Sequence, residues 1–175
     1  DDALYGGLLS GLTATGGFHA TRAGGIYVNR SALTLTDVRI TGNEVWDDGS
    51  DMRGGGLGAE YSAGVMRRCV LTQNTCGDTP ADWRSKSYGG GAWLQGGNWD
   101  FVDCELNGNQ ALGTTHDNGA WGTGGGGLYF DEGPALRLCL RNTLVIGNAV
   151  DGNQDLGAGL YVPASEQDRS ARVTL

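Results

Sequence analysis

The sequence predicts an all-β fold, a right-handed parallel β-helix solenoid of about five coils with three short strands each, and three observations predict it. A glycine-rich phrase recurs five times, a second phrase that ends in asparagine recurs four times, and the apolar residues between them alternate with period two. Bodies of fixed length joined by inserts of variable length are typical of a solenoid.

The glycine-rich phrase is a glycine cluster followed by an apolar residue. These apolar residues are Ile26, Leu57, Ala92, Leu128 and Leu160, with spacings of 31, 35, 36 and 32 residues. The second phrase ends at Asn43, Asn74, Asn109 and Asn148, which follow the first four apolar markers by 17, 17, 17 and 20 residues. Since the repeat body is nearly constant, we expect the variable inserts to project from one rim.

The repeat bodies carry three strand patterns. Alternate positions are mostly apolar just after each glycine cluster, and at 3, 5, 8 and 10 residues before each asparagine. A period of two places these side chains on one face of a strand, whereas no long segment has helical spacing. Equivalent strands of neighbouring coils would stack about 4.8 Å apart. We expect one β-helix segment over residues 1–175, part of a longer chain, with repeats near 24–43, 54–74, 89–109, 124–148 and 157–175.

Composition narrows the class of partner. The 175 residues include 33 glycines and carry a net charge of −8. Negative charge argues against nucleic acid or an anionic membrane surface as a partner. No apolar run approaches the roughly 20 residues of a membrane span, so we expect no direct membrane insertion by this segment.

Asparagine recurs at the end of the second phrase because of its local chemistry. The side chain tolerates turn geometry and can satisfy backbone groups of the turn. We therefore expect Asn43, Asn74, Asn109 and Asn148 to point inward and to form a hydrogen-bonded structural ladder along one corner.

The four cysteines do not suggest a metal centre. Cys69 and Cys104 occupy the same inward position in neighbouring repeats, where stacking would separate their Cβ atoms by about 4.8 Å. A disulfide prefers roughly 3.8 Å, so buried free thiols are favoured over a disulfide. Cys139 falls on an outward position and Cys76 in an insert. His19 and His116 lie far apart in the sequence, so no zinc site is expected, and the cysteines do not define the redox compartment.

An aromatic residue follows the glycine phrase in four of five repeats. These residues form a candidate binding strip of Tyr27, Trp93, Tyr129 and Tyr161. One interpretation is an exposed strip on a flat sheet that binds glycan or protein. The other is ordinary strand propensity, with each ring covered by a neighbouring insert.

The inserts share tryptophan and aspartate. A candidate rim is formed by Trp46, Trp83, Trp121, Asp47, Asp48 and Asp117. Carboxylates suit calcium, but no insert has a D-x-D-x-D-G loop, so no cofactor is predicted and calcium stays an alternative. The other interpretation is solvated loops in which each tryptophan covers its own coil.

Two carboxylates are the basis for the alternative hypothesis that the protein is an enzyme. Glu60 and Asp131 occupy outward positions two repeats apart, hence roughly 10 Å from each other. Inverting glycoside hydrolysis uses about 6.5–9.5 Å, so polysaccharide cleavage is the second interpretation and no catalytic residue is assigned. The triplet Asn29-Arg30-Ser31 matches the acceptor pattern for N-glycosylation.

The two phrases together resemble the repeats of chlamydial polymorphic outer-membrane proteins, which carry a GGA[I/L] phrase and an F-x-x-N phrase. The first corresponds to clusters such as Gly24-Gly25-Ile26 and Gly90-Gly91-Ala92. In the second, Ile40, Leu71, Leu106 and Val145 stand where that family has phenylalanine. The resemblance covers roughly residues 24–162. It implies a β-helix in an adhesin-like or architectural protein, and no catalytic residues.

The sequence therefore predicts a non-enzymatic architectural or adhesive segment of an extracellular or cell-surface protein. Its expected partners are proteins in a larger surface assembly or an extracellular glycan.

Overall fold

The computed structural model describes residues 5–46, 51–77, 86–113, 123–131, 137–151, 155–162 and 172–174. The described residues contain strands and no helix, and hence no helix of the length and hydropathy needed to cross a membrane. All strand pairs are parallel and join residues about one repeat apart, which confirms the predicted β-solenoid.

The strands form five parallel sheets. Sheet A contains β1 (Tyr5–Ser10), β5 (Ser31–Thr36), β10 (Ala63–Arg67), β15 (Asn98–Val102), β20 (Arg137–Arg141) and β25 (Arg172–Thr174). Sheet B contains β2 (Thr13–Thr15), β6 (Arg39–Thr41), β11 (Val70–Thr72), β16 (Glu105–Asn107) and β21 (Leu144–Ile146). Sheet C contains β3 (Phe18–His19), β7 (Glu44–Val45), β12 (Thr75–Cys76), β17 (Gln110–Leu112) and β22 (Ala149–Asp151).

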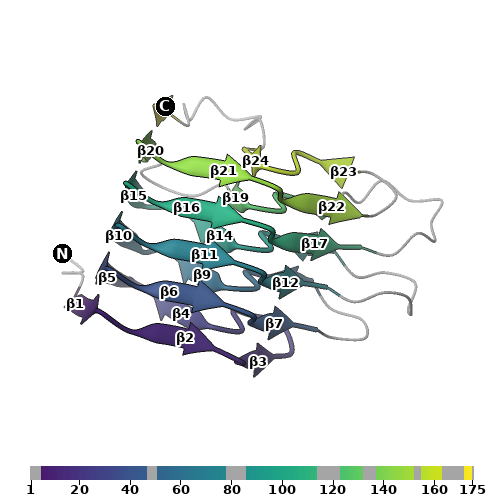
Figure 1. Cartoon of the computed structure of the whole chain (residues 1–175), viewed down its shortest axis with the longest axis horizontal. Coiled ribbons are helices and arrows are strands. Elements are labelled where there is room, and N and C mark those ends of the chain that lie inside the picture. Colours follow the sequence, from purple (N-terminus) through teal and green to yellow (C-terminus); the bar gives the residue numbers. More distant parts are fainter. Residues whose placement is uncertain are drawn as a thin grey trace.

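The remaining two sheets complete each coil. Sheet D contains β8 (Met52–Arg53), β13 (Ser87–Tyr88), β18 (Thr123–Gly124) and β23 (Asp155–Leu156). Sheet E contains β4 (Ile26–Asn29), β9 (Leu57–Glu60), β14 (Ala92–Gln95), β19 (Leu128–Asp131) and β24 (Leu160–Tyr161). In Figure 1 the chain crosses the front from left to right along β2, returns behind through β4 and rises to β5, so the coil is right-handed.

The coils differ from the prediction in their strand content. Three interior coils, β5–β9, β10–β14 and β15–β19, each lie between two other coils, and β1–β4 and β20–β24 flank them. Each interior coil has five strands, so the predicted three were incomplete. The two that were missed lie at the ends of the segments predicted as inserts, because residues 44–53, 75–88, 110–123 and 149–156 each begin in sheet C and end in sheet D.

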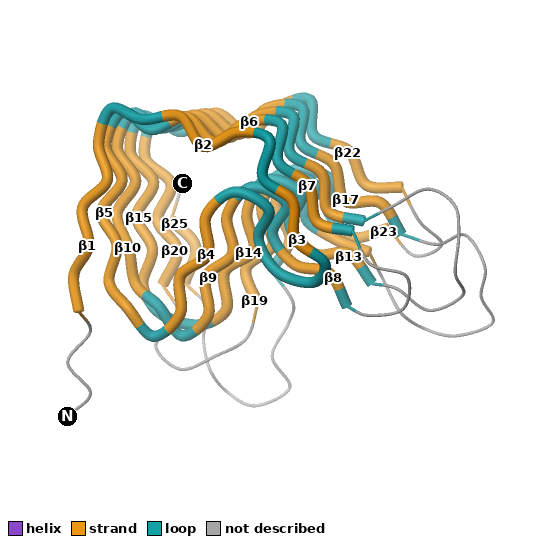
Figure 2. The backbone as a smooth tube through the Cα atoms, turned by 90° about the horizontal axis from the view of Figure 1, so that it is seen from below, coloured by secondary structure: helices purple, strands orange, loops and turns teal. Residues whose placement is uncertain are grey.

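Sheets C and D form a second, narrower layer pair, here named the arm. Figure 2 shows sheets A, B and E around one interior, with the arm projecting to one side. The described ends of all four predicted inserts therefore lie on the same side of the molecule. The main core lies between sheets A, B and E, and a small separate cluster of Val45, Met52 and Cys76 fills the arm.

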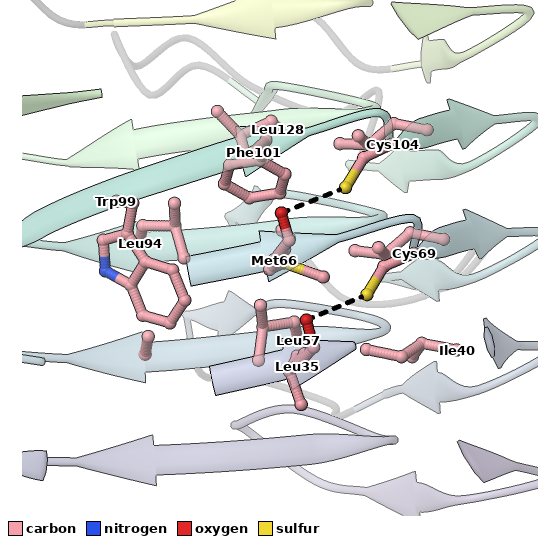
Figure 3. Packing of buried hydrophobic residues seen from close by; sticks show 14 of the residues in the cluster. Leu35, Ile40, Leu57, Met66, Cys69, Leu94, Trp99, Phe101, Cys104 and Leu128 are labelled. Carbon is pink, nitrogen blue, oxygen red and sulfur yellow. Dashed lines mark hydrogen bonds between the residues drawn. The ribbon is translucent and has the colours of Figure 1, made fainter. Parts of the chain in front are cut away.

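The main core is packed by complementary sizes in neighbouring coils. Gly64 lies opposite Trp99 in sheet A, and a Cβ atom at Gly64 would overlap the indole ring. Trp99 is fully buried and its Nε1–H donates to the Ser62 carbonyl over 2.9 Å. Figure 3 shows Trp99, Met66 and Phe101 within this interior. One glycine thus makes room for the largest side chain of the core.

The predicted asparagine ladder is present at the corner between sheets B and C. Asn43, Asn74 and Asn109 are buried, and each donates from its backbone N–H and its Nδ2 to the Oδ1 of the next asparagine, ending at Asn148. Each Nδ2 also donates to a carbonyl of the preceding coil, as Asn74 does to Ile40 over 2.9 Å. The ladder therefore satisfies turn groups inside the molecule and is structural.

Candidate functional site

The predicted aromatic strip exists as a row on sheet E. Tyr27, Gly58, Trp93, Tyr129 and Tyr161 are opposite one another in successive strands. The row is not an exposed face, however, because Trp93 is 1% exposed and Tyr129 8% exposed. Tyr161 is half-buried, and only Tyr27, at 40%, keeps substantial exposure. The prediction of an exposed binding strip is therefore wrong for most of its length.

Sheet D covers the strip. The Arg53 guanidinium carbon lies 5.2 Å from the Trp93 ring centroid, and the Tyr88 ring centroid lies 4.7 Å from that of Tyr129. Tyr161 continues the stack at 5.1 Å from Tyr129. Burial, together with the charges of nearby carboxylates, raises the pKa of Tyr88. The alternative interpretation, in which the inserts cover the rings, is the one that the structure supports.

Sequence reasoning missed the residues that cover the strip, although a signal was available. Arg22, Arg53, Tyr88, Gly124 and Leu156 all precede the apolar marker of their repeat by four residues. The structure pairs successive members of this series across sheet D, beginning with a bridge between Arg22 and Arg53. A recurrent position with a bulky residue before four of the five glycine clusters could have predicted a covering row.

Three polar side chains meet at the exposed end of the strip. Arg22 Nη1 donates to the Tyr27 hydroxyl over 2.6 Å and to Glu60 Oε2 over 3.3 Å, and the Tyr27 hydroxyl donates to Glu60 Oε2 over 2.7 Å. The Arg22 guanidinium also lies 5.5 Å from the Tyr27 ring centroid. Partial burial and the hydrogen bond to Glu60 raise the pKa of Tyr27. The cluster joins the first coil to the second.

The two carboxylates considered for catalysis lie in one row but in different settings. Glu60 and Asp131 are both opposite Gln95 in sheet E, two coil steps or about 10 Å apart. Glu60 is 8% exposed and is already held by two donors, whereas Asp131 is half-buried. The structure therefore does not bring the pair to the usual separation for glycoside hydrolysis.

The cysteines are four buried free thiols, as favoured for Cys69 and Cys104. Those two stack in adjacent coils, where their thiols donate to the carbonyls of Leu35 and Met66 respectively (Figure 3). A hydrogen bond with Cys69, together with burial, raises the pKa of Cys104. Thr143 occupies the equivalent position of the next coil, and its hydroxyl donates to the Phe101 carbonyl over 3.2 Å. This common hydrogen-bond pattern indicates a structural position.

The other two cysteines require a correction and an addition. Cys76 is not in a loop: it belongs to β12 and is fully buried in the arm, because sheet C turns this position inward. Burial raises the pKa of its thiol to about 12. Cys139 alternates with the core residues Leu138 and Leu140 and so faces outward, yet it is only 7% exposed.

The predicted rim is described only in part. Trp46 is 40% exposed and its ring centroid lies 6.5 Å from that of Phe18, which is 60% exposed. Trp83, Trp121, Asp47, Asp48 and Asp117 lie outside the described residues. Within the described ranges, no three side chains of histidine, cysteine, aspartate or glutamate converge on a point that could hold a metal ion.

No protein-family model, no curated protein and no solved structure matches the chain. The resemblance to the chlamydial repeats therefore stays a prediction.

Proposed function

We propose that the chain is a non-enzymatic architectural and adhesive segment of an extracellular or cell-surface protein, and that it presents an interaction face to a glycan or a protein. The observation that carries this proposal is the continuous parallel stack, in which the asparagine ladder joins successive coils through buried hydrogen bonds. Such a stack is stiff because neighbouring coils pair with each other in all five sheets. The repeat phrases and the resemblance they carry support the extracellular setting.

The arrangement of charged groups also favours a scaffold. Glu60 is tied to Arg22 and Tyr27, and Asp100 lies 2.7 Å from Arg137 and 3.9 Å from Arg141. Asp37 forms a two-pronged pair with Arg68, with distances of 2.7 and 2.8 Å. These carboxylates link neighbouring coils, so their first role is to join the stack.

The test is retention and product release on a panel of insoluble and acidic polysaccharides, with calcium present and absent. Retention without released oligosaccharide is the expected result if the partner is a glycan. Binding to proteins in extracellular extracts tests the alternative of a protein partner. Release of oligosaccharide would overturn the non-enzymatic proposal.

One observation favours polysaccharide cleavage as a second candidate function. The Arg22–Tyr27–Glu60 cluster combines a cation, a phenol and a carboxylate within hydrogen-bond distance. Any turnover should then fall strongly in Glu60→Gln and in Asp131→Asn. Turnover that survives both substitutions would remove these two residues from the mechanism.

A further inference from the structure

The outer face of sheet C carries a pair of exposed aromatic rings. Phe18 lies in β3 and Trp46 directly follows β7, the neighbouring strand in this sheet (Figure 1). Their ring centroids are 6.5 Å apart and their planes are inclined by 41°. Among the described residues, this is the one ring contact in which both side chains are at least 40% exposed.

These rings do not take part in the core of the arm. Val45 lies between Glu44 and Trp46 in the chain and is fully buried, so its two neighbours point to the opposite, outer side. The Phe18 ring leaves 60% of its surface in water. Burial of aromatic surface is favourable, and folding leaves this surface in water. A ligand that covers the two rings would therefore gain binding free energy from them.

Polar side chains continue the same face. Glu44 is opposite Phe18, Thr75 is opposite Glu44 and Gln110 is opposite Thr75, and each of these three positions is exposed or half-buried. A carboxylate, a hydroxyl and an amide thus follow Phe18 at steps of about 4.8 Å, and Trp46 lies two residues beyond Glu44 in the chain. Rings that contact the apolar faces of sugars, beside groups that hydrogen-bond their hydroxyls, are the complement of a carbohydrate chain.

The size and charge of this face select the type of ligand. A stable protein interface needs about 800 Å² on each partner, whereas the described part of this face is a narrow strip of two rings with three polar neighbours. Glu44 lies at its centre, and the chain carries a net charge of −8, so an acidic polysaccharide would be repelled. We propose that Phe18, Trp46 and Glu44 bind an uncharged polysaccharide. This inference rests on the proposed function. It specifies the class of glycan that the chain binds and the face that binds it.

The experiment is isothermal titration of the full chain with neutral hexasaccharides of glucose, xylose, mannose and N-acetylglucosamine, and with hexagalacturonate as the acidic probe. At least one neutral probe should bind, and hexagalacturonate should bind more than tenfold more weakly. Phe18→Ala and Trp46→Ala should each weaken binding by about tenfold or more, and Glu44→Ala by several fold. Phe18→Tyr should retain binding because it keeps the ring.

A matched control is Leu144→Ala. Leu144 is 49% exposed on sheet B, so its loss removes a comparable exposed apolar side chain from a different face. Binding should be unchanged in this variant, and circular dichroism should show the same β-sheet content in all variants.

Three outcomes would overturn the inference. They are the absence of binding to every neutral probe, equal binding by the two ring variants and the parent, and concentration-dependent self-association that Trp46→Ala abolishes. The last result would assign the face to a second copy of the chain. In each case retention on an insoluble polysaccharide without turnover would leave the proposed scaffold function standing, so the two failures can be told apart.

Discussion

Asn74 illustrates how much one residue contributes to the stack. Its Oδ1 accepts from the backbone N–H and the Nδ2 of Asn43, and its own Nδ2 donates to Asn109 and to the Ile40 carbonyl. Asn74→Ala would leave several buried groups without partners, and each such group costs about 1–3 kcal/mol. We expect the free energy of unfolding in urea to fall by at least about 3 kcal/mol.

The control for this substitution is Asn107→Ala. Asn107 is half-buried on the outer side of β16, and its Nδ2 donates to Glu105 over 3.1 Å, its one acceptor among the described residues. Its loss should change the free energy of unfolding by no more than about 0.5 kcal/mol. Equal effects of the two substitutions would contradict a structural ladder.

Gln73 is a residue that the local backbone does not favour. Its φ is +54°, and the equivalent corner positions of the other coils are Gly16, Gly42, Gly108 and Gly147. A non-glycine residue in this left-handed region costs about 1–2 kcal/mol. Glycine avoids that cost but loses more conformational entropy on folding, so only part of the cost is recovered. Gln73→Gly should therefore raise the free energy of unfolding by about 0.5–1 kcal/mol. A lower melting temperature in this variant would show that the glutamine side chain makes a stabilising contact.

At the scale of elements, the packing of sheet D on sheet E decides what the aromatic row does. Trp93 is 1% exposed beneath Arg53, so Trp93→Ala should lower the free energy of unfolding by about 3–5 kcal/mol. Tyr27→Phe keeps the exposed ring and removes only the hydroxyl of the Arg22–Tyr27–Glu60 cluster, and it should cost about 1 kcal/mol. Thermal unfolding compares the two. A Trp93→Ala variant as stable as the parent would contradict a stabilising role for the packing of sheet D on this row.

The arm also gives the molecule a dependence on alkaline pH. Cys76 is fully buried beside Val45 and Met52, and burial raises the pKa of its thiol from 9.0 to about 12. Because this thiol ionises first in the unfolded chain, its contribution to stability should be constant below pH 9 and should be lost as pH rises from 9 toward 12. In Cys76→Ala the fall should be less steep, although Tyr27 and Tyr88, whose pKa values are also raised, act in the same direction. Urea unfolding at several pH values measures this fall. If the free energy of unfolding fell equally with pH in the parent and in Cys76→Ala, the assignment to Cys76 would be contradicted.

Sequence reasoning predicted the strands that are long enough to show an alternation of apolar and polar residues. Apart from β24, the strands of sheets A, B and E have three to six residues and lie at nearly fixed distances from glycine or asparagine, so the sequence shows their period-two pattern. Sheet D strands have two residues each, too few to alternate, and the inserts separate them from sheet C by variable distances. The one available sign of sheet C was the apolar residue two positions after each asparagine, namely Val45, Cys76, Ala111 and Val150.

The candidate site was harder to predict than the fold because it depends on sheet D, whose short strands leave no alternating pattern in the sequence. Register alone placed Tyr27, Trp93 and Tyr129 in one row, and that placement is confirmed. Exposure depends on a neighbouring sheet, which the sequence pattern did not show. The exposed ring of Phe18 was missed because its repeat has glycine, Gly17, in place of the asparagine that marks the corner elsewhere.

On the scale of the whole molecule, stability should vary along the stack. Inward residues of the interior coils, such as Leu71 and Leu94, are fully buried, whereas Leu12 and Val145, in the flanking coils, are only partly buried. In a solenoid each coil is stabilised by its contacts with its neighbours, so a coil whose inward residues are less buried opens more easily.

Hydrogen exchange can measure this gradient within sheet B, where every coil contributes a strand of three residues. We expect the amides of β11 and β16 to exchange at least about tenfold more slowly than those of β2 and β21, since about 1.4 kcal/mol of additional opening free energy has that effect. Mass spectrometry of peptic peptides at two protein concentrations separates opening from association. Equal protection of all five strands at both concentrations would mean that the stack opens as one cooperative unit, and that the ladder couples the flanking coils to the interior as strongly as the core does.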